Sequence, residues 1–474
     1  MSGLMDRDAH EQARLVREGE VSAEELVAAA IDTIEQRDGE VNAVVHKRYE
    51  QALDEARRIT GSTDGPFAGV PTLVKSMDAL AGAPAHLGSV YLAGRGRTAA
   101  EDSPVVRRLR QAGFIVLGQT AAPEFGLVSV SETKLHGVTR NPWDLTRTPG
   151  GSSGGASAVV SAGMVAVGQG GDGGGSIRMP AAFCHLVGLK PSHGLLPGRI
   201  EKGDRWGHSV PAVVTRSVRD TAAVVEFLAD RANRSPRLPA FRHGDLSDAV
   251  VGRDPRPLRI GYVAQAPAYA PQVVDSVRDA VASMAGLMES LGHRVEEAHP
   301  VDLFDPHVLS AFFDTLSVTV AQSVDQLTAE VGAAPGPDDL DPITRFWEER
   351  GRQLSAVELA DELSWQQGYK VRMAGWWQSF DLLLSPVFST PAPEVGWPWR
   401  EPGGIKKSVD VLTFTAPFNT TGQPAISVPA AVTDNGLPLG VQFVADFGRE
   451  DLLLRVAHQV ETARPWNSIA PRLR

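Results

Sequence analysis

The spacing of apolar residues predicts short strands that alternate with helices. Ser22 and Glu25 form a capping-box pattern that opens an amphipathic run at 26–34, within a segment (8–58) that is helical by pattern. Apolar segments at 70–74 and 114–118 predict strands on either side of a helix at 103–112. The pattern repeats as a strand at 258–263, a helix at 271–291 and a strand just after it. Such alternation is typical of an α/β fold with a parallel or mixed sheet.

The chain shows no internal repeat and is expected to form one large domain over residues 1–474. Its first 60 residues form an N-terminal helical segment in this interpretation, and a second helical run is expected at 43–58. Residues 231–257 are rich in Pro, Arg and Asp and predict a surface loop. Residues 300–410 combine helical patterns with a tryptophan cluster and predict a variable helical layer. The tryptophans are expected either in the core or along a substrate pocket.

Composition narrows the classes of partner. The net charge is −11, from 46 basic and 57 acidic side chains, which argues against a nucleic-acid-binding surface. No apolar run reaches the roughly 18 residues that a membrane span needs, and no signal peptide is apparent. The single cysteine, Cys184, cannot form an intramolecular disulfide, and the paired cysteines of a zinc site are missing. We therefore expect a cytoplasmic protein without cofactor, metal, nucleic acid or membrane as a partner.

Two glycine-rich loops that carry serines, at 149–153 and 168–178, are the most unusual feature of the sequence. Glycine lets main-chain N–H groups approach a ligand closely, so the run Gly173-Gly174-Gly175-Ser176 can direct several donors at one point. Preorganised donors of this kind stabilise the oxyanion of a tetrahedral intermediate. The loops therefore indicate acyl-transfer chemistry at a serine.

Other interpretations of these loops fit less well. Neither loop continues as the Gly-Lys-Ser/Thr of a phosphate loop. The segment 151–155 formally matches the Gly-x-Ser-x-Gly elbow with Ser153 at its centre, but an elbow follows a buried strand and 141–150 is a loop by composition. Functionless turns are also a poor explanation, because each glycine carries an entropic cost on folding.

A serine nucleophile needs a base, which could be a histidine or a lysine. His185, His193 and His208 lie downstream of the loops, without a setting that distinguishes one of them. Lys75 ends an apolar run that predicts an interior strand, and burial would lower the pKa of its amine toward neutrality.

These segments closely resemble the amidase signature family. The Gly-Gly-Ser-Ser-Gly-Gly loop of the family matches 150–155, its Gly-Gly-Ser-x-Arg loop matches 174–178, and its Gly-Val-Pro strand leading to a lysine matches 69–75. The similarity extends to 139–143, 180–184, 187–191, 422–429 and 436–443, and it is weak only across 230–257 and 300–400. It implies a central mixed, mostly parallel twisted sheet with helices on both faces, and a substrate-side location for 300–410.

The resemblance also implies a Ser-Ser-Lys triad. Ser176 would be the acylated nucleophile, Ser152, held by a cis peptide, would relay the proton, and neutral Lys75 would be the final base. The family's oxyanion hole corresponds to the amides of Gly173, Gly174, Gly175 and Ser176, with Ser153, Asp172 and Arg178 as loop support. Three positions depart from the family pattern: Gly173 in the oxyanion loop, Ser76 after the lysine, and His185 after the cysteine.

Three segments, 414–419, 422–427 and 447–454, are similar to those of family members that hydrolyse nylon-oligomer cyclic dimers. The family also includes urethanases and aryl acylamidases. The resemblance therefore implies that the substrates are small, uncharged and rather hydrophobic amides, carbamates or aryl esters. The alternative is a glutamine-dependent amidotransferase A-type subunit acting in a complex, which the acidic charge disfavours near tRNA. A catalytically dead binding protein is disfavoured because all three triad positions are present. The sequence leaves a homodimer open.

Overall fold

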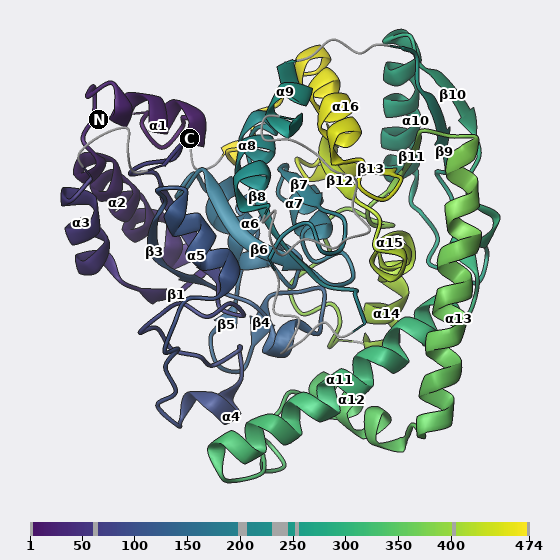
Figure 1. The fold of residues 1–474 in the computed structure, drawn as a ribbon, viewed down its shortest axis with the longest axis horizontal. Helices are drawn as coiled ribbons and strands as arrows, with labels where there is room; N and C mark the ends of the chain where they lie inside the picture. Colours follow the sequence, from purple (N-terminus) through teal and green to yellow (C-terminus); the bar gives the residue numbers. More distant parts are fainter. Residues whose placement is uncertain are drawn as a thin grey trace.

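An 11-stranded sheet runs through the protein, with helices on both of its faces (Figure 1). The computed structural model describes residues 3–59, 65–197, 206–229, 245–251, 256–400 and 404–471. In spatial order the strands are β1 (Val44–Lys47), β3 (Ile115–Thr120), β2 (Pro71–Lys75), β6 (Val167–Asp172), β8 (Val210–Thr215), β7 (Val187–Lys190), β12 (Ala425–Val432), β13 (Pro438–Ala445), β11 (Leu382–Pro386), β9 (Arg259–Tyr262) and β10 (Arg294–Glu297). A separate hairpin joins β4 (Glu132–Thr133) and β5 (Gly137–Val138).

The sheet is mixed, as expected, but the prediction that it is mostly parallel is wrong. Six of the ten strand pairings among the described residues are antiparallel. Parallel pairs occur on the two sides, in β3-β2-β6 and in β11-β9-β10. In the middle, β8 lies between β6 and β7 and is antiparallel to both, and the short connection 433–437 makes β12 and β13 a hairpin.

The helices surround the sheet. They are α1 (Ala9–Arg17), α2 (Ala23–Val41), α3 (Tyr49–Arg57), α4 (Val90–Ala93), α5 (Pro104–Gln111), α6 (Gly154–Ser161), α7 (Arg178–Phe183), α8 (Val218–Leu228), α9 (Asp245–Val251), α10 (Asp275–Ser290), α11 (Val308–Val331), α12 (Pro342–Gln353), α13 (Ala356–Gly375), α14 (Gly404–Asp410), α15 (Ala416–Thr421) and α16 (Glu450–Ala463). Two of the helices, α6 and α7, are completely buried. Short 3-10 turns are η1 (Glu124–Gly126), η2 (Val301–Phe304), η3 (Trp376–Gln378) and η4 (Val411–Phe414).

Apolar residues on both faces of the sheet explain why helices cover both. Successive side chains of a strand point to opposite faces, and Val213 and Val214 of β8 accordingly belong to two different buried clusters. The cluster of Val213 also contains side chains of α5, α8, α10 and α16, whereas that of Val214 contains side chains of α2 and α6. Helices on both faces of one α/β sheet confirm the predicted fold class.

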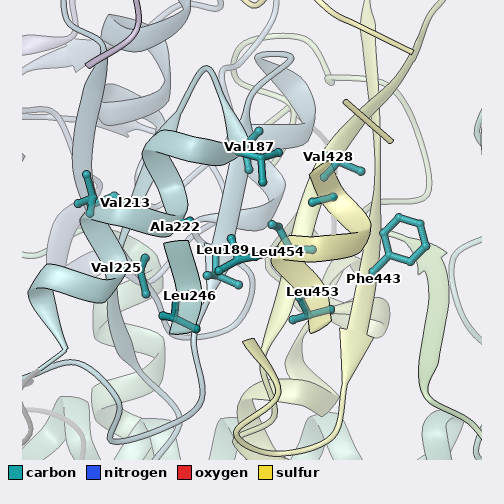
Figure 2. Close-up of a cluster of buried hydrophobic side chains, with 14 of the residues drawn as sticks. Val187, Leu189, Val213, Ala222, Val225, Leu246, Val428, Phe443, Leu453 and Leu454 are labelled. Atoms are coloured by element: carbon teal, nitrogen blue, oxygen red, sulfur yellow. The ribbon is translucent and has the colours of Figure 1, made fainter. Parts of the chain in front are cut away.

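Figure 2 shows part of the first cluster. Val187 and Leu189 of β7 and Val213 of β8 lie opposite side chains of α8, α9 and α16, among them Leu453 and Leu454 of α16. These five side chains are at most 2% exposed. Burying an apolar side chain of this size stabilises the fold by roughly 1.5–3 kcal/mol.

Several local predictions are confirmed. Ser22 and Glu25 form a complete capping box at the start of α2. The helix expected at 103–112 is α5, which begins with Pro104 at its first position. Helix α6 follows the first glycine-rich loop, and residues 168–172 of the second glycine-rich stretch belong to strand β6.

Three expectations need correction. The run 43–58 is not all helix, because 44–47 form edge strand β1 against β3 before α3 begins. The predicted loop 231–257 contains helix α9; its residues 231–244 and 252–255 lie outside the described residues. The stretch 300–410 supplies the long helices α11 to α13, which form the outer layer at the bottom and right of Figure 1, but it also supplies sheet strand β11.

Among the described residues, no helix is both long enough and apolar enough to cross a lipid bilayer.

Candidate active site

Lys75 is the last residue of β2, an interior strand with β3 on one side and β6 on the other. All five β2 residues are buried, and Lys75 itself is 4% exposed. Its main-chain N–H donates to the side-chain oxygen of Gln169 in β6, at 3.0 Å. The apolar strand therefore carries the lysine into the interior, and the neighbouring strand fixes the end of β2.

The Lys75 amine lies between two serine hydroxyls. Its Nζ is 2.7 Å from Ser152 Oγ and 3.0 Å from Ser153 Oγ. Burial disfavours the ammonium form and lowers the pKa of Lys75 to about 8, although the carboxylates of Asp78 and Asp172 act in the opposite direction. An appreciable fraction of the amine is thus neutral near physiological pH, and a neutral amine in hydrogen-bond reach of a hydroxyl can accept its proton.

The loop that presents Ser152 is closely packed around glycine. The Gly151–Ser152 peptide bond is cis, as the resemblance implied. A Cβ atom at Gly151 would lie 2.5 Å from the main-chain nitrogen of Val130, so no larger residue fits there. Gly150 adopts a left-handed conformation with φ of 84°, which glycine accommodates without strain. These glycines set the direction in which Ser152 faces Lys75.

Ser153 joins the two glycine-rich loops. Its hydroxyl donates to the carbonyl of Gly171 at 3.0 Å and accepts from the Gly171 N–H at 3.2 Å. Its main-chain N–H donates to the carbonyl oxygen of Ser176, at 3.2 Å. The first loop, with Ser152, is therefore held directly beside the residue predicted as the nucleophile.

Solvent access differs among the three triad positions. Lys75 and Ser152 are each 4% exposed, whereas Ser176, in the loop between β6 and α7, is only partly buried. Of the three, Ser176 is thus the one that a substrate can reach from outside. This ordering suits a nucleophile at the surface of the site and a base in the interior.

A buried ion pair holds the second loop. Asp172 and Arg178 are both fully buried, and the guanidinium donates to both carboxylate oxygens at 3.0 Å. Burial alone would raise the pKa of Asp172, but Arg178 outweighs it and holds that pKa well below the usual range. Arg178 also donates to side chains of Asn419 and Gln442, at 2.6 and 3.1 Å. The loop is thereby fixed to the C-terminal part of the chain.

The carboxylate of Asp172 also accepts a hydrogen bond from one of the four amides predicted for the oxyanion hole. The N–H of Gly175 donates to Asp172 Oδ1 at 2.8 Å, and the N–H of Ile177 donates to Oδ2 at 3.2 Å. Gly175 therefore serves to close the loop, and an incoming oxyanion would have to compete with Asp172 for its N–H.

Apolar side chains lie against the glycine-rich loop from outside. A Cβ atom at Gly174 would lie 3.2 Å from Leu412 and 3.3 Å from Phe312, which places these two side chains in contact with the loop. Phe312 comes from α11, and Leu412 from η4. Both belong to one buried apolar cluster that reaches from α7 to α12.

The three histidines considered as bases occupy other packing sites. His185 lies edge-on against Trp143, and the ring of His208 stacks on Phe312. The ring of His193 lies against Gly207. Within the described part of the chain, no three or more His, Cys, Asp and Glu side chains come together as a metal ion would require.

Sequence reasoning missed the partners that come from distant segments. Gln169 is a polar residue in the middle of β6, flanked by glycines and completely buried, and its position there is a signal that could have been used. Asn419 and Gln442 lie more than 240 residues from Arg178 and carry no local pattern that links them to the loops. Only the folded sheet brings them together.

The chain is similar to known amidases over most of its length. The amidase family profile matches residues 25–454. The 6-aminohexanoate-cyclic-dimer hydrolase of Paenarthrobacter ureafaciens is 35% identical over 98% of this chain and 97% of its own length. The structure of a 6-aminohexanoate cyclic dimer hydrolase with bound substrate superposes with a TM-score of 0.92, at 33% identity and 99% coverage of both chains.

A bacterial aryl acylamidase of the amidase signature family superposes with a TM-score of 0.87, at 28% identity and 98% coverage of both chains. The family profile spans most of the chain, and the identity to the first relative extends over nearly all of it. The chain therefore belongs to the amidase signature family and is a hydrolase of amide bonds.

Proposed function

We propose that this protein hydrolyses amides through an acyl-enzyme on Ser176, with Ser152 as the proton relay and neutral Lys75 as the base. The observation that carries the proposal is the buried amine of Lys75, 2.7 Å from Ser152 Oγ, beside a loop whose serine, Ser176, is only partly buried. A nucleophilic hydroxyl activated by an adjacent base is the common feature of such enzymes.

Protons balance in each step. As Ser176 Oγ bonds to the substrate carbonyl carbon, its proton passes to Ser152 Oγ, and the Ser152 proton passes to Lys75 Nζ. The resulting ammonium returns a proton by the same route to the leaving amine when the C–N bond breaks. Water then repeats the sequence on the acyl-enzyme and releases the acid.

The developing oxyanion needs donors at the glycine loop. We assign this role to the amides of Gly173, Gly174 and Ser176, because the Gly175 N–H is engaged by Asp172. Ser153, Asp172 and Arg178 act as support in this proposal, since their hydrogen bonds hold the loops and do not require contact with substrate.

We further propose that the substrates are small, uncharged and rather hydrophobic. Phe312 and Leu412, both less than 10% exposed, are the apolar side chains that contact the loop at Gly174. The names of the related cyclic-dimer hydrolase and aryl acylamidase support the same class. Carbamates and aryl esters pass through the same acyl-enzyme chemistry and are included in the proposal.

The nucleophile is tested with Ser176→Ala, for which we expect kcat on an acyl p-nitroanilide to fall by at least about 10⁴-fold. Acid quenching of the wild-type protein during turnover of an activated ester should give an acyl adduct on the peptide that contains Ser176. Ser157→Ala is the control, a buried serine of α6 whose hydroxyl has no hydrogen-bond partner among the described residues. Near-normal turnover by the Ser176 variant, or an adduct on Ser153, would rule out the assignment.

The base is tested by pH dependence. Only the neutral amine can take a proton, and its fraction increases as pH rises through the pKa of about 8. We expect kcat/KM to rise about tenfold per pH unit below that value and to level off above it. Lys75→Arg, which cannot lose its proton at these pH values, should be inactive throughout. A flat profile between pH 6 and 9 in the wild type contradicts the proposal.

The substrate class is tested by comparing hexanoyl, acetyl and succinyl p-nitroanilides. We expect the hexanoyl compound to have a kcat/KM at least about tenfold above that of the negatively charged succinyl compound. Phe312→Ala should lower the hexanoyl-to-acetyl ratio by about tenfold, whereas the exposed Phe346→Ala should leave it unchanged. This ratio does not depend on the amount of folded enzyme. An equal preference for all three compounds argues against contact between the substrate and the apolar side chains of Phe312 and Leu412.

A further inference from the structure

A carboxylate that the mechanism above does not use lies at the same end of β2 as the base. Asp78 follows Lys75 by three residues, and its main-chain N–H donates to the Lys75 carbonyl at 2.9 Å. This turn brings Asp78 back toward the end of the strand that carries the amine. The side chain is half-buried at this position.

A buried amide fixes the orientation of that carboxylate. Gln169 Nε2 donates to Asp78 Oδ2 at 2.8 Å, while Gln169 Oε1 accepts the main-chain N–H of Lys75 at 3.0 Å. Gln169 is fully buried in β6, and Gln119 of β3 also approaches the Asp78 carbonyl oxygen, at 3.4 Å. One glutamine side chain therefore connects the carboxylate of Asp78 with the main chain of the base.

Two carboxylates act on the Lys75 amine. Asp78 acts on it from the turn after β2, and Asp172 from the end of β6. The negative charge of Asp172 is balanced by the guanidinium of Arg178, which contacts both of its oxygens. Thr120 lies opposite Lys75 in β3, and the hydroxyls of Ser152 and Ser153 approach the amine from the loop before α6. The Asp78 carboxylate accepts a hydrogen bond from the Gln169 amide, which holds it at the end of β2.

We propose that Asp78, held by Gln169, is a positioning residue that sets the charge state of the base Lys75 and stabilises the ammonium formed when Ser176 is deprotonated. This inference rests on the proposed function of Lys75. An anion near an amine favours the charged form of that amine. Asp78 therefore makes Lys75 a stronger base, and at the same time it confines activity to a higher pH range.

The test is the pH profile of kcat/KM for Asp78→Asn. Asparagine keeps an oxygen that can accept from Gln169 but removes the charge, so the amine should lose its proton at lower pH. We expect the acidic limb of the profile to shift downward by about one pH unit. At pH 6, the activity of the variant, expressed as a fraction of its own plateau, should be up to about tenfold higher than that of the wild type. The plateau itself should fall by less than about tenfold, because a weaker base takes the proton less readily.

Matched variants separate a charge effect from a packing effect. Asp78→Glu retains the charge and should keep the limb near its wild-type position. Asp102→Asn removes another carboxylate that follows β2, one that caps the N–H of Ala81, and should not move the limb. Asp78→Ser provides a second neutral variant if the asparagine form does not fold. A merely structural role would lower activity at all pH values without a shift.

Different results would overturn the proposed role of Lys75 and the proposed role of Asp78. Absence of amide turnover in the wild-type protein, or a wild-type limb far from pH 8, would overturn the assignment of Lys75. A normal wild-type profile together with unshifted limbs in both neutral Asp78 variants would overturn the role of Asp78 alone.

Discussion

The burial of one amine is the constraint on which the rest of the site depends. An ammonium group in the interior is costly, so Lys75 must either find hydrogen-bond partners or give up its proton. In this structure it has both options, because two serine hydroxyls lie within 3.0 Å and burial brings its pKa to about 8. A lysine at a solvated strand end would keep its proton and could not act as a base.

The two glycine-rich loops can be understood from the same constraint. Ser152 reaches the buried amine from a loop packed so closely against the main chain of Val130 that a side chain at Gly151 has no room. Ser153 then joins the loops, and the Asp172–Arg178 pair ties the second loop to Asn419 and thus to the C-terminal half. Removing one partner of such a buried pair typically destabilises a fold by about 3–5 kcal/mol.

Local signals in the sequence predicted local structure well. The capping box at Ser22 and the apolar run that ends at Lys75 each specify an element from a few neighbouring residues. Strand direction was not predictable in this way, because β8 lies between β6 and β7 only once the chain has folded back. The support from Gln169 and Asn419 was missed for the same physical reason: it depends on pairings across distant segments.

The central claim is that the Lys75 amine is neutral at the pH of catalysis, and a direct titration tests it best. Lysines labelled with ¹³C at the Cε position can be followed by NMR from pH 6 to 11, with the Lys75 signal assigned by its loss in Lys75→Arg. We predict a midpoint near 8 for this signal, well below the ordinary lysine value of about 10.4. A midpoint at or above that ordinary value would contradict the account.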